Sequence, residues 1–187
     1  MAKTARAEPW LRGTLQELPA VHRAVLHALQ LAQEDLMRWC VELSAQEWYA
    51  RPSGIAPVAF HVRHAARSMD RLLTYAEGQQ LKNEQMAALL SEMNGDALPE
   101  EILGELRDGF KRAELRIRAL AGANLEEPRT VGRQALPTTI GGLLVHIADH
   151  TQRHVGQAII TAKLSRAARD QYPGAPDSAQ IRVYSSD

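Results

Sequence analysis

Residues 143–157 read LLVHIADHTQRHVGQ, and histidine recurs in this stretch at every fourth position, as His146, His150 and His154. Residues four apart lie on one face of an α-helix, with their Cβ atoms about 6 Å apart. An apolar neighbour, Ile147, falls on the same stripe. The pattern therefore predicts a helix with three imidazoles along one side.

Helical periodicity extends to three further long segments of the chain. We expect helices over residues 19–43, from residues 55–57 to about 77, over residues 99–121, and from Thr138 or Thr139 to about Arg166. Short extra helices are expected in the connections at residues 45–50 and 83–91, the first opened by the capping-box pair Ser44 and Glu47. Four long helices joined by connections longer than tight hairpins predict an all-α four-helix bundle.

Signals for β-strands are nearly missing from the sequence. Aromatic residues make up 5% of the chain, and strand-like alternation is limited to residues 180–184. Residues 122–137 contain two glycines and two prolines and are interpreted as a loop. We interpret residues 1–187 as a single domain, with a core over about residues 15–166 and a C-terminal tail over residues 167–187.

Charge and composition exclude several classes of protein. Lys+Arg and Asp+Glu both number 22, so the formal net charge is zero, and a nucleic-acid partner is not expected. Apolar runs fall far short of the roughly 20 residues that a membrane span needs, and no apolar segment of a secretory signal follows the first residues. The lone cysteine, Cys40, is interpreted as a buried structural thiol. Together these features predict a cytoplasmic protein.

Two groups of histidines indicate a metal site. His146 and His154 are separated by about 12 Å along a helix, so only one adjacent pair can bind a given ion, and His150 belongs to both pairs. The helix predicted from residues 55–57 carries His61 and His64 and is the expected source of a third ligand. Three neutral imidazoles leave a coordination position open, as in catalytic sites. Imidazole ligands suit zinc and nickel alike.

Each histidine also has a structural interpretation. A single histidine on an apolar helix face is usually a hydrogen-bonded core residue, and His22 and His27 are interpreted as surface or core-edge residues. No clear general base accompanies the histidines. Asp149 lies about 100° around the helix from His150 and is interpreted as a surface or supporting residue, while Glu47 is a weak candidate for an acid or base. We interpret three other charged residues as members of exposed ion pairs on helix faces: Arg67, Asp70 and Arg153.

The histidine segments resemble the DinB-like superfamily of four-helix metalloproteins. The late-helix motif, His-x-x-x-His-x-Gly-Gln in that family, is similar to residues 150–157, where this chain has Val155 before Gly156 and Gln157. The segment FHVRHAARSMDRLL, residues 60–73, resembles the family's second-helix motif and follows a Pro-Ser-Gly approach at residues 52–54. The resemblance covers about residues 15–165.

The resemblance implies a particular ligand set. Matched position by position, the family's metal ligands fall on His64, His150 and His154. His146 matches a less regular upstream histidine and is expected to be a neighbour of the site. His61, one turn before His64, is the reserve ligand.

The resemblance also implies a class of function. Relatives of known activity are metal-dependent transferases and isomerases that use low-molecular-weight thiols, such as bacillithiol transferases and mycothiol-dependent isomerases, and other members are described as hydrolases or damage-inducible proteins. We therefore expect a metal-dependent hydrolase or thiol S-transferase with one divalent ion, zinc or nickel, a small-molecule substrate and a homodimeric assembly. The alternative is a non-catalytic stress-response or interaction protein. Di-iron chemistry is disfavoured because the helices lack a Glu-x-x-His pair.

Overall fold

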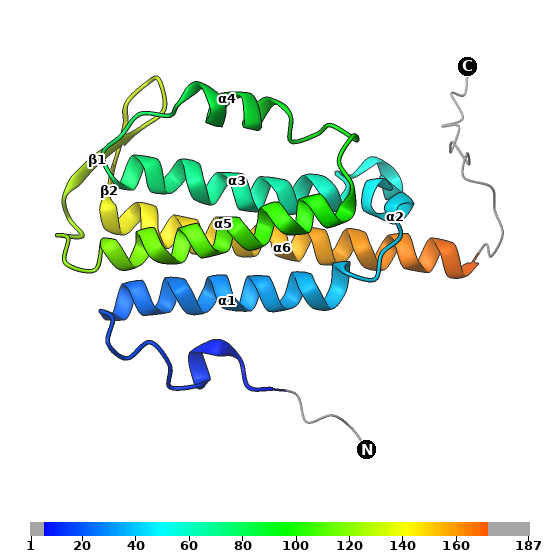
Figure 1. Ribbon diagram of the computed structural model, residues 1–187, viewed down its shortest axis with the longest axis horizontal. Helices are drawn as coiled ribbons and strands as arrows, with labels where there is room; N and C mark the ends of the chain where they lie inside the picture. Colours follow the sequence, from blue (N-terminus) through cyan, green and yellow to red (C-terminus); the bar gives the residue numbers. More distant parts are fainter. Residues whose placement is uncertain (1–5, 172–187) are drawn as a thin grey trace.

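Four long helices lie side by side in the computed structural model of the protein, which describes residues 6–171 (Figure 1). They are α1 (Ala20–Cys40), α3 (Val58–Ala76), α5 (Pro99–Ala119) and α6 (Ile140–Gln171). The helix α3 packs against α5 and α6. The helix α1 packs against α6 and also contacts α5. Figure 1 shows α1 and α6 running in one direction and α3 and α5 in the opposite one. The expected all-α four-helix bundle is confirmed.

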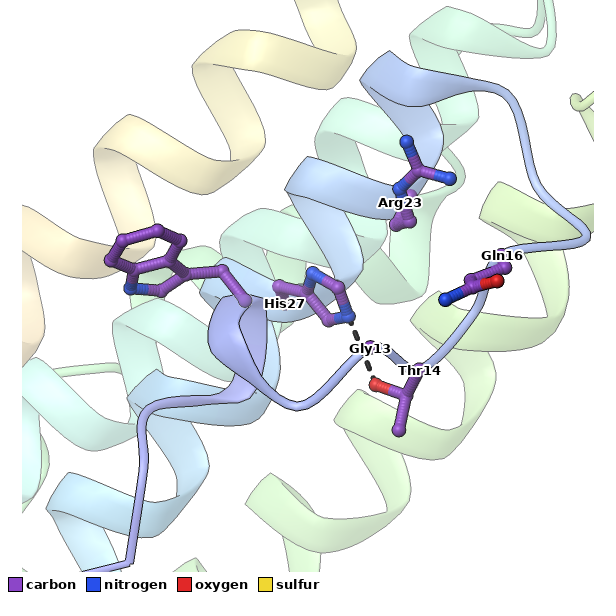
Figure 2. A pocket seen from close by; sticks show the side chains of 6 residues that line it. Gly13, Thr14, Gln16, Arg23 and His27 are labelled. Carbon is purple, nitrogen blue, oxygen red and sulfur yellow. Dashed lines mark hydrogen bonds between the residues drawn. The ribbon is translucent and has the colours of Figure 1, made fainter.

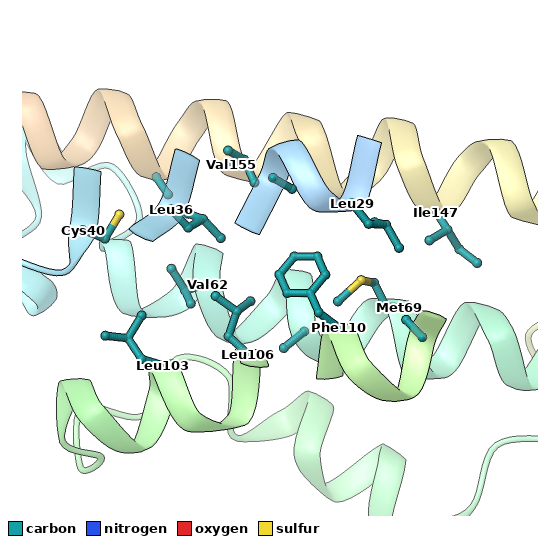
Figure 3. Packing of buried hydrophobic residues seen from close by; sticks show 14 of the residues in the cluster. Leu29, Leu36, Cys40, Val62, Met69, Leu103, Leu106, Phe110, Ile147 and Val155 are labelled. Atoms are coloured by element: carbon teal, nitrogen blue, oxygen red, sulfur yellow. The ribbon is translucent and has the colours of Figure 1, made fainter. Parts of the chain in front are cut away.

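The core forms where the apolar stripes of the four helices meet (Figure 3). Leu36, Leu106 and Ile147 are each at most 1% exposed, and complete burial of such a side chain contributes about 1.5–3 kcal/mol to stability. Cys40 is fully buried in the same cluster, and burial raises the pKa of its thiol to about 12. The interpretation of Cys40 as a structural thiol is confirmed.

Two short helices lie in the connections, as expected. The helix α2 (Ala45–Tyr49) begins with a capping box, in which Ser44 Oγ accepts from the Glu47 amide and the Ser44 amide donates to Glu47 Oε2 at 2.8 Å. The helix α4 (Asn83–Leu90) contacts α3, and Figure 1 shows it along the outside of that helix. Single 3-10 turns occur at Pro9–Leu11 and Pro52–Gly54.

The connection between α5 and α6 corrects one expectation. Residues 122–137 were expected to be a loop, but β1 (Pro128–Val131) and β2 (Leu136–Thr139) form an antiparallel pair. Strands of four residues are too short to show a clear alternation in sequence, and their pairing depends on the turn between them, where Gly132 has a φ of 72°.

The boundaries of α6 agree in part with the sequence pattern. Thr139 caps the helix, since its Oγ1 accepts from the Gly142 amide at 3.0 Å. The helix continues to Gln171, so the first residues of the expected tail are helical. The remainder of the tail, including the strand-like residues 180–184, lies outside the described residues. Across residues 6–171, the helices are too short or too polar to cross a bilayer.

Candidate metal centre

Three histidines from two helices converge at one side of the bundle. His64 comes from α3, and His150 and His154 come from α6, which packs against α3. Each offers one nitrogen, and these nitrogens all lie within 4.8 Å of one another. Among these nitrogens, His64 Nε2 lies 2.8 Å from His150 Nε2. These three residues are the set that the resemblance implied, and the grouping could hold a metal ion.

The helix geometry of α6 explains why the imidazoles lie at the edge of the core. Thr151 and Val155 are buried against the other helices, at 1% and 2% exposure. His150 and His154 precede them by one residue, a rotation of about 100° around the helix axis. Both imidazoles are consequently only partly buried, which leaves the group accessible from one side.

Glu92 contacts one ring nitrogen of His64. Glu92 Oε2 lies 2.6 Å from His64 Nδ1, and an ionised carboxylate can only accept a hydrogen bond. A neutral His64 that donates from Nδ1 to this carboxylate keeps a lone pair on Nε2, the nitrogen that faces His150. Burial would raise the pKa of Glu92, but hydrogen bonds from His64 and Arg71 outweigh it and hold that pKa below its usual value. The carboxyl is thus ionised at neutral pH.

Burial also holds the two histidines of α6 in their neutral form. Desolvation, with a smaller contribution from the nearby His64, lowers the pKa of His150 to about 4 and that of His154 to about 3. Metal ions bind neutral imidazole, so both side chains have the required protonation state at pH 7.

The spacing of the nitrogens fits an ion after a small adjustment. Two nitrogens bound to one ion at about 2.0–2.1 Å lie roughly 3.0–3.4 Å apart at ordinary coordination angles. The separation of 2.8 Å between His64 Nε2 and His150 Nε2 is a few tenths of an ångström shorter. The buried Nδ1 of His150 has no hydrogen-bond partner among the described residues, so a proton can move there when Nε2 binds an ion.

The two remaining histidines of these helices lie beside the group. His61 is 6% exposed, and its Nδ1 lies 3.1 Å from His154 Nδ1. His146 is 48% exposed and lies 3.7 Å from Asp149. Phe60 covers the group on one side, with its ring stacked on that of His64 at a centroid distance of 5.4 Å.

The surface position considered for the two histidines of α1 was wrong. His22 and His27 are buried, at 1% and 6% exposure. His22 Nε2 lies 3.0 Å from the carbonyl oxygen of Leu120. His27 Nε2 lies 3.1 Å from Thr14 Oγ1, within a surface pocket between the N-terminal segment and α1 (Figure 2). Both are buried because segments outside their own helix cover them, which periodicity within α1 does not reveal.

The predicted ion pairs separate into exposed and covered ones. Arg153 and Asp149 form an exposed pair at 2.8 Å, as expected. The interpretation of Arg67 as exposed was wrong, since its side chain is 15% exposed and binds Glu105 with two nitrogens. It also donates to the Ala88 carbonyl oxygen at the end of α4, which lies across this part of α3.

Two carboxylates that sequence reasoning considered have other contacts. Asp70 accepts from Arg116 at 2.7 Å, and its side chain is 38% exposed. Glu47 closes the cap of α2 and lies 3.0 Å from Arg169. Each of these two carboxylates therefore has a structural role, in an ion pair or a helix cap. Glu92, the carboxylate that contacts the histidine group, was missed because it lies in a connection with no recognisable motif.

The fold and the site define a four-helix-bundle protein with a three-histidine group between α3 and α6. The chain belongs to the DinB superfamily, whose family model matches residues 28–158. The matched region extends from α1 into α6 and includes all three histidines. A comparison with curated proteins found no match.

Proposed function

We propose that this protein is a metal-dependent enzyme in which His64, His150 and His154 bind one divalent ion and present it to a small-molecule substrate. The observation that carries the proposal is the convergence of three imidazole nitrogens within 4.8 Å, from two helices. Membership of the DinB superfamily supports it. Zinc and nickel are the proposed ions, because imidazole ligands suit both.

The residues around the group suit a catalytic role. Three protein ligands leave at least one coordination position for another molecule. Phe60 covers the ring of His64 on one side, and the partial exposure of His150 and His154 leaves an approach from solvent. A bound ion would supply Lewis acidity that lowers the pKa of water or of a thiol.

The surrounding carboxylates favour thiol transfer over hydrolysis. Hydrolysis usually needs a general base that moves a proton from water. Both oxygens of Glu92 already accept hydrogen bonds, from His64 and from Arg71, so this carboxylate is committed to the histidine. Transfer of a low-molecular-weight thiol makes a smaller demand, since a thiol at a metal site loses its proton without a dedicated base. We therefore propose a thiol S-transferase, with a hydrolase as the second candidate.

Metal analysis and a turnover assay test this proposal together. Protein purified without chelator should contain close to one equivalent of zinc or nickel by elemental analysis. It should couple a low-molecular-weight thiol to an electrophilic acceptor, lose this activity after chelator treatment and regain it on reloading. Turnover of activated esters alone would support the hydrolase instead. A bound ion without either turnover would support the non-catalytic alternative, and absence of a bound ion would contradict the proposal.

A further inference from the structure

Three arginines on α3 hold the segment of residues 83–96, here termed the strap, against the bundle. Arg63, Arg67 and Arg71 are spaced four residues apart and therefore lie along one face of the helix. Arg67 donates to a backbone oxygen of the strap at 2.6 Å, and Arg63 donates to another at 2.8 Å. Arg71 donates to Glu92 Oε1 at 2.8 Å. The strap is thus held largely by hydrogen bonds from charged donors.

Glu92 is the deeply buried residue of this strap. No residue of α4 is buried, and Leu90 is 82% exposed, whereas Glu92 is only 3% exposed. Burial of a carboxylate is costly unless charged or polar partners compensate for it. Its two partners are Arg71, which holds the strap, and His64, which belongs to the histidine group.

We propose that Glu92 is a positioning residue that fixes His64 in the tautomer able to bind a metal ion, so that the strap sets the metal affinity of the site. This inference rests on the proposed metal site. A neutral imidazole can carry its proton on either nitrogen. Glu92 accepts the proton of Nδ1 and leaves the lone pair of Nε2 directed toward His150. Without this acceptor, a proton on Nε2 would block the metal-binding atom.

The same contact couples the metal to the strap. Carboxylates that orient a ligating histidine typically account for about 10- to 100-fold in metal affinity. Because coupling between two equilibria is reciprocal, an ion on His64 also favours the position of the strap that brings Glu92 to His64. Amide hydrogens of the strap should therefore exchange more slowly in zinc-loaded protein than in metal-free protein.

Zinc affinity of two matched variants tests the proposal. Glu92→Gln keeps the size of the side chain, but His64 and Arg71 contact different oxygens of Glu92, and the amide offers an acceptor at only one of these two positions. We expect this variant to bind Zn²⁺ about 10- to 100-fold more weakly than wild type in a competition assay with a chelating dye. The control is Glu105→Gln, which removes a carboxylate of α5 that is paired with Arg67 of α3, and its zinc affinity should equal that of wild type.

If Glu92→Gln does not fold, a measurement on the metal-free wild-type protein still tests the role of Glu92. Nitrogen-15 NMR of the histidine rings should show His64 protonated on Nδ1. Protonation on Nε2, or equal zinc affinity of wild type and Glu92→Gln, would overturn the role of Glu92. Failure of wild type itself to bind zinc would instead overturn the proposed metal site.

Discussion

His64 Nε2 and His150 Nε2 lie 2.8 Å apart, although 86 residues separate the two histidines in the chain. The contact joins α3 to α6 at the edge of the core, where the helices expose part of each imidazole. His154 contributes a third nitrogen, and the three nitrogens all lie within 4.8 Å of one another. An ion bound there would link α3 and α6, which also contact each other through His61 Nδ1 and His154 Nδ1 at 3.1 Å.

Substitution of single histidines should separate ligands from neighbours. We expect His154→Ala to lose nearly all bound metal, because two imidazoles at the remaining positions bind an ion far more weakly than three. His146→Ala is the control, since His146 is 48% exposed and lies outside the three-histidine group. Elemental analysis of the purified variants measures the difference. If His146→Ala also lost the ion, the ligand assignment would be wrong.

Removal of the metal should lower thermal stability. A ligand at a thousand times its Kd stabilises the folded state by about 4 kcal/mol, and each kcal/mol shifts Tm by about 2–4 °C in a chain of this size. We therefore expect Tm to fall by roughly 8–16 °C when a strong chelator is added to zinc-saturated protein. Differential scanning calorimetry measures the shift. The variant His150→Ala should show no response to chelator, and a wild-type Tm indifferent to chelator would refute the prediction.

The metal-free protein should become less stable as the pH falls from neutral. Burial lowers the pKa values of His150 and His154 from 6.5 to about 4 and about 3. Between these values and pH 6.5 the unfolded chain binds more protons, so the free energy of unfolding decreases as the pH falls. Above pH 7 these two histidines no longer make the free energy of unfolding depend on pH.

Urea denaturation of metal-free protein at several pH values between 7.5 and 5 tests this dependence. That range lies above the ordinary pKa of carboxyl groups, so their contribution stays small. A double variant, His150→Asn with His154→Asn, should lose most of the slope. An equal slope in the double variant would show that other groups cause the dependence.

Replacement of two glycines of α6 by alanine should change the stability of the protein in opposite directions. A Cβ at Gly156 would meet no atom within 4 Å, so Gly156→Ala should raise stability by about 0.5–1 kcal/mol through the better helix propensity of alanine. A Cβ at Gly141 would lie 3.1 Å from the backbone oxygen of Leu125, which also accepts from the Gly141 amide at 2.8 Å. Gly141→Ala should therefore destabilise the protein by about 1–3 kcal/mol. Chemical denaturation measures the change in the free energy of unfolding for each variant. A stabilised Gly141→Ala variant would contradict the packing at the start of α6.

Periodicity and spacing predicted much of the fold and the histidine group from sequence. The four long helices follow from apolar residues at helical spacing, and Leu106 and Ile117 are fully buried as that spacing predicts. The histidines of α6 were identifiable because residues four apart share a helix face whatever the tertiary structure. The choice of His64 depended on resemblance to a family, since spacing alone did not distinguish it from His61.

Features that depend on packing between distant segments were not predictable. Glu92 lies in a connection of mixed composition, and its role depends on the position of the strap over α3. The arginines at positions 63, 67 and 71 carried a usable signal, because cations at four-residue spacing indicate acceptors on one helix face. The hairpin of β1 and β2 gave no such signal, since each strand has only four residues.

The most direct test of the metal site is a crystal structure of zinc-loaded protein with anomalous data recorded at the zinc edge. We predict one strong anomalous peak between α3 and α6, bound by His64, His150 and His154 at about 2.0–2.1 Å. A peak held by other residues, or no peak at these three histidines in zinc-saturated crystals, would contradict the assignment of the metal site.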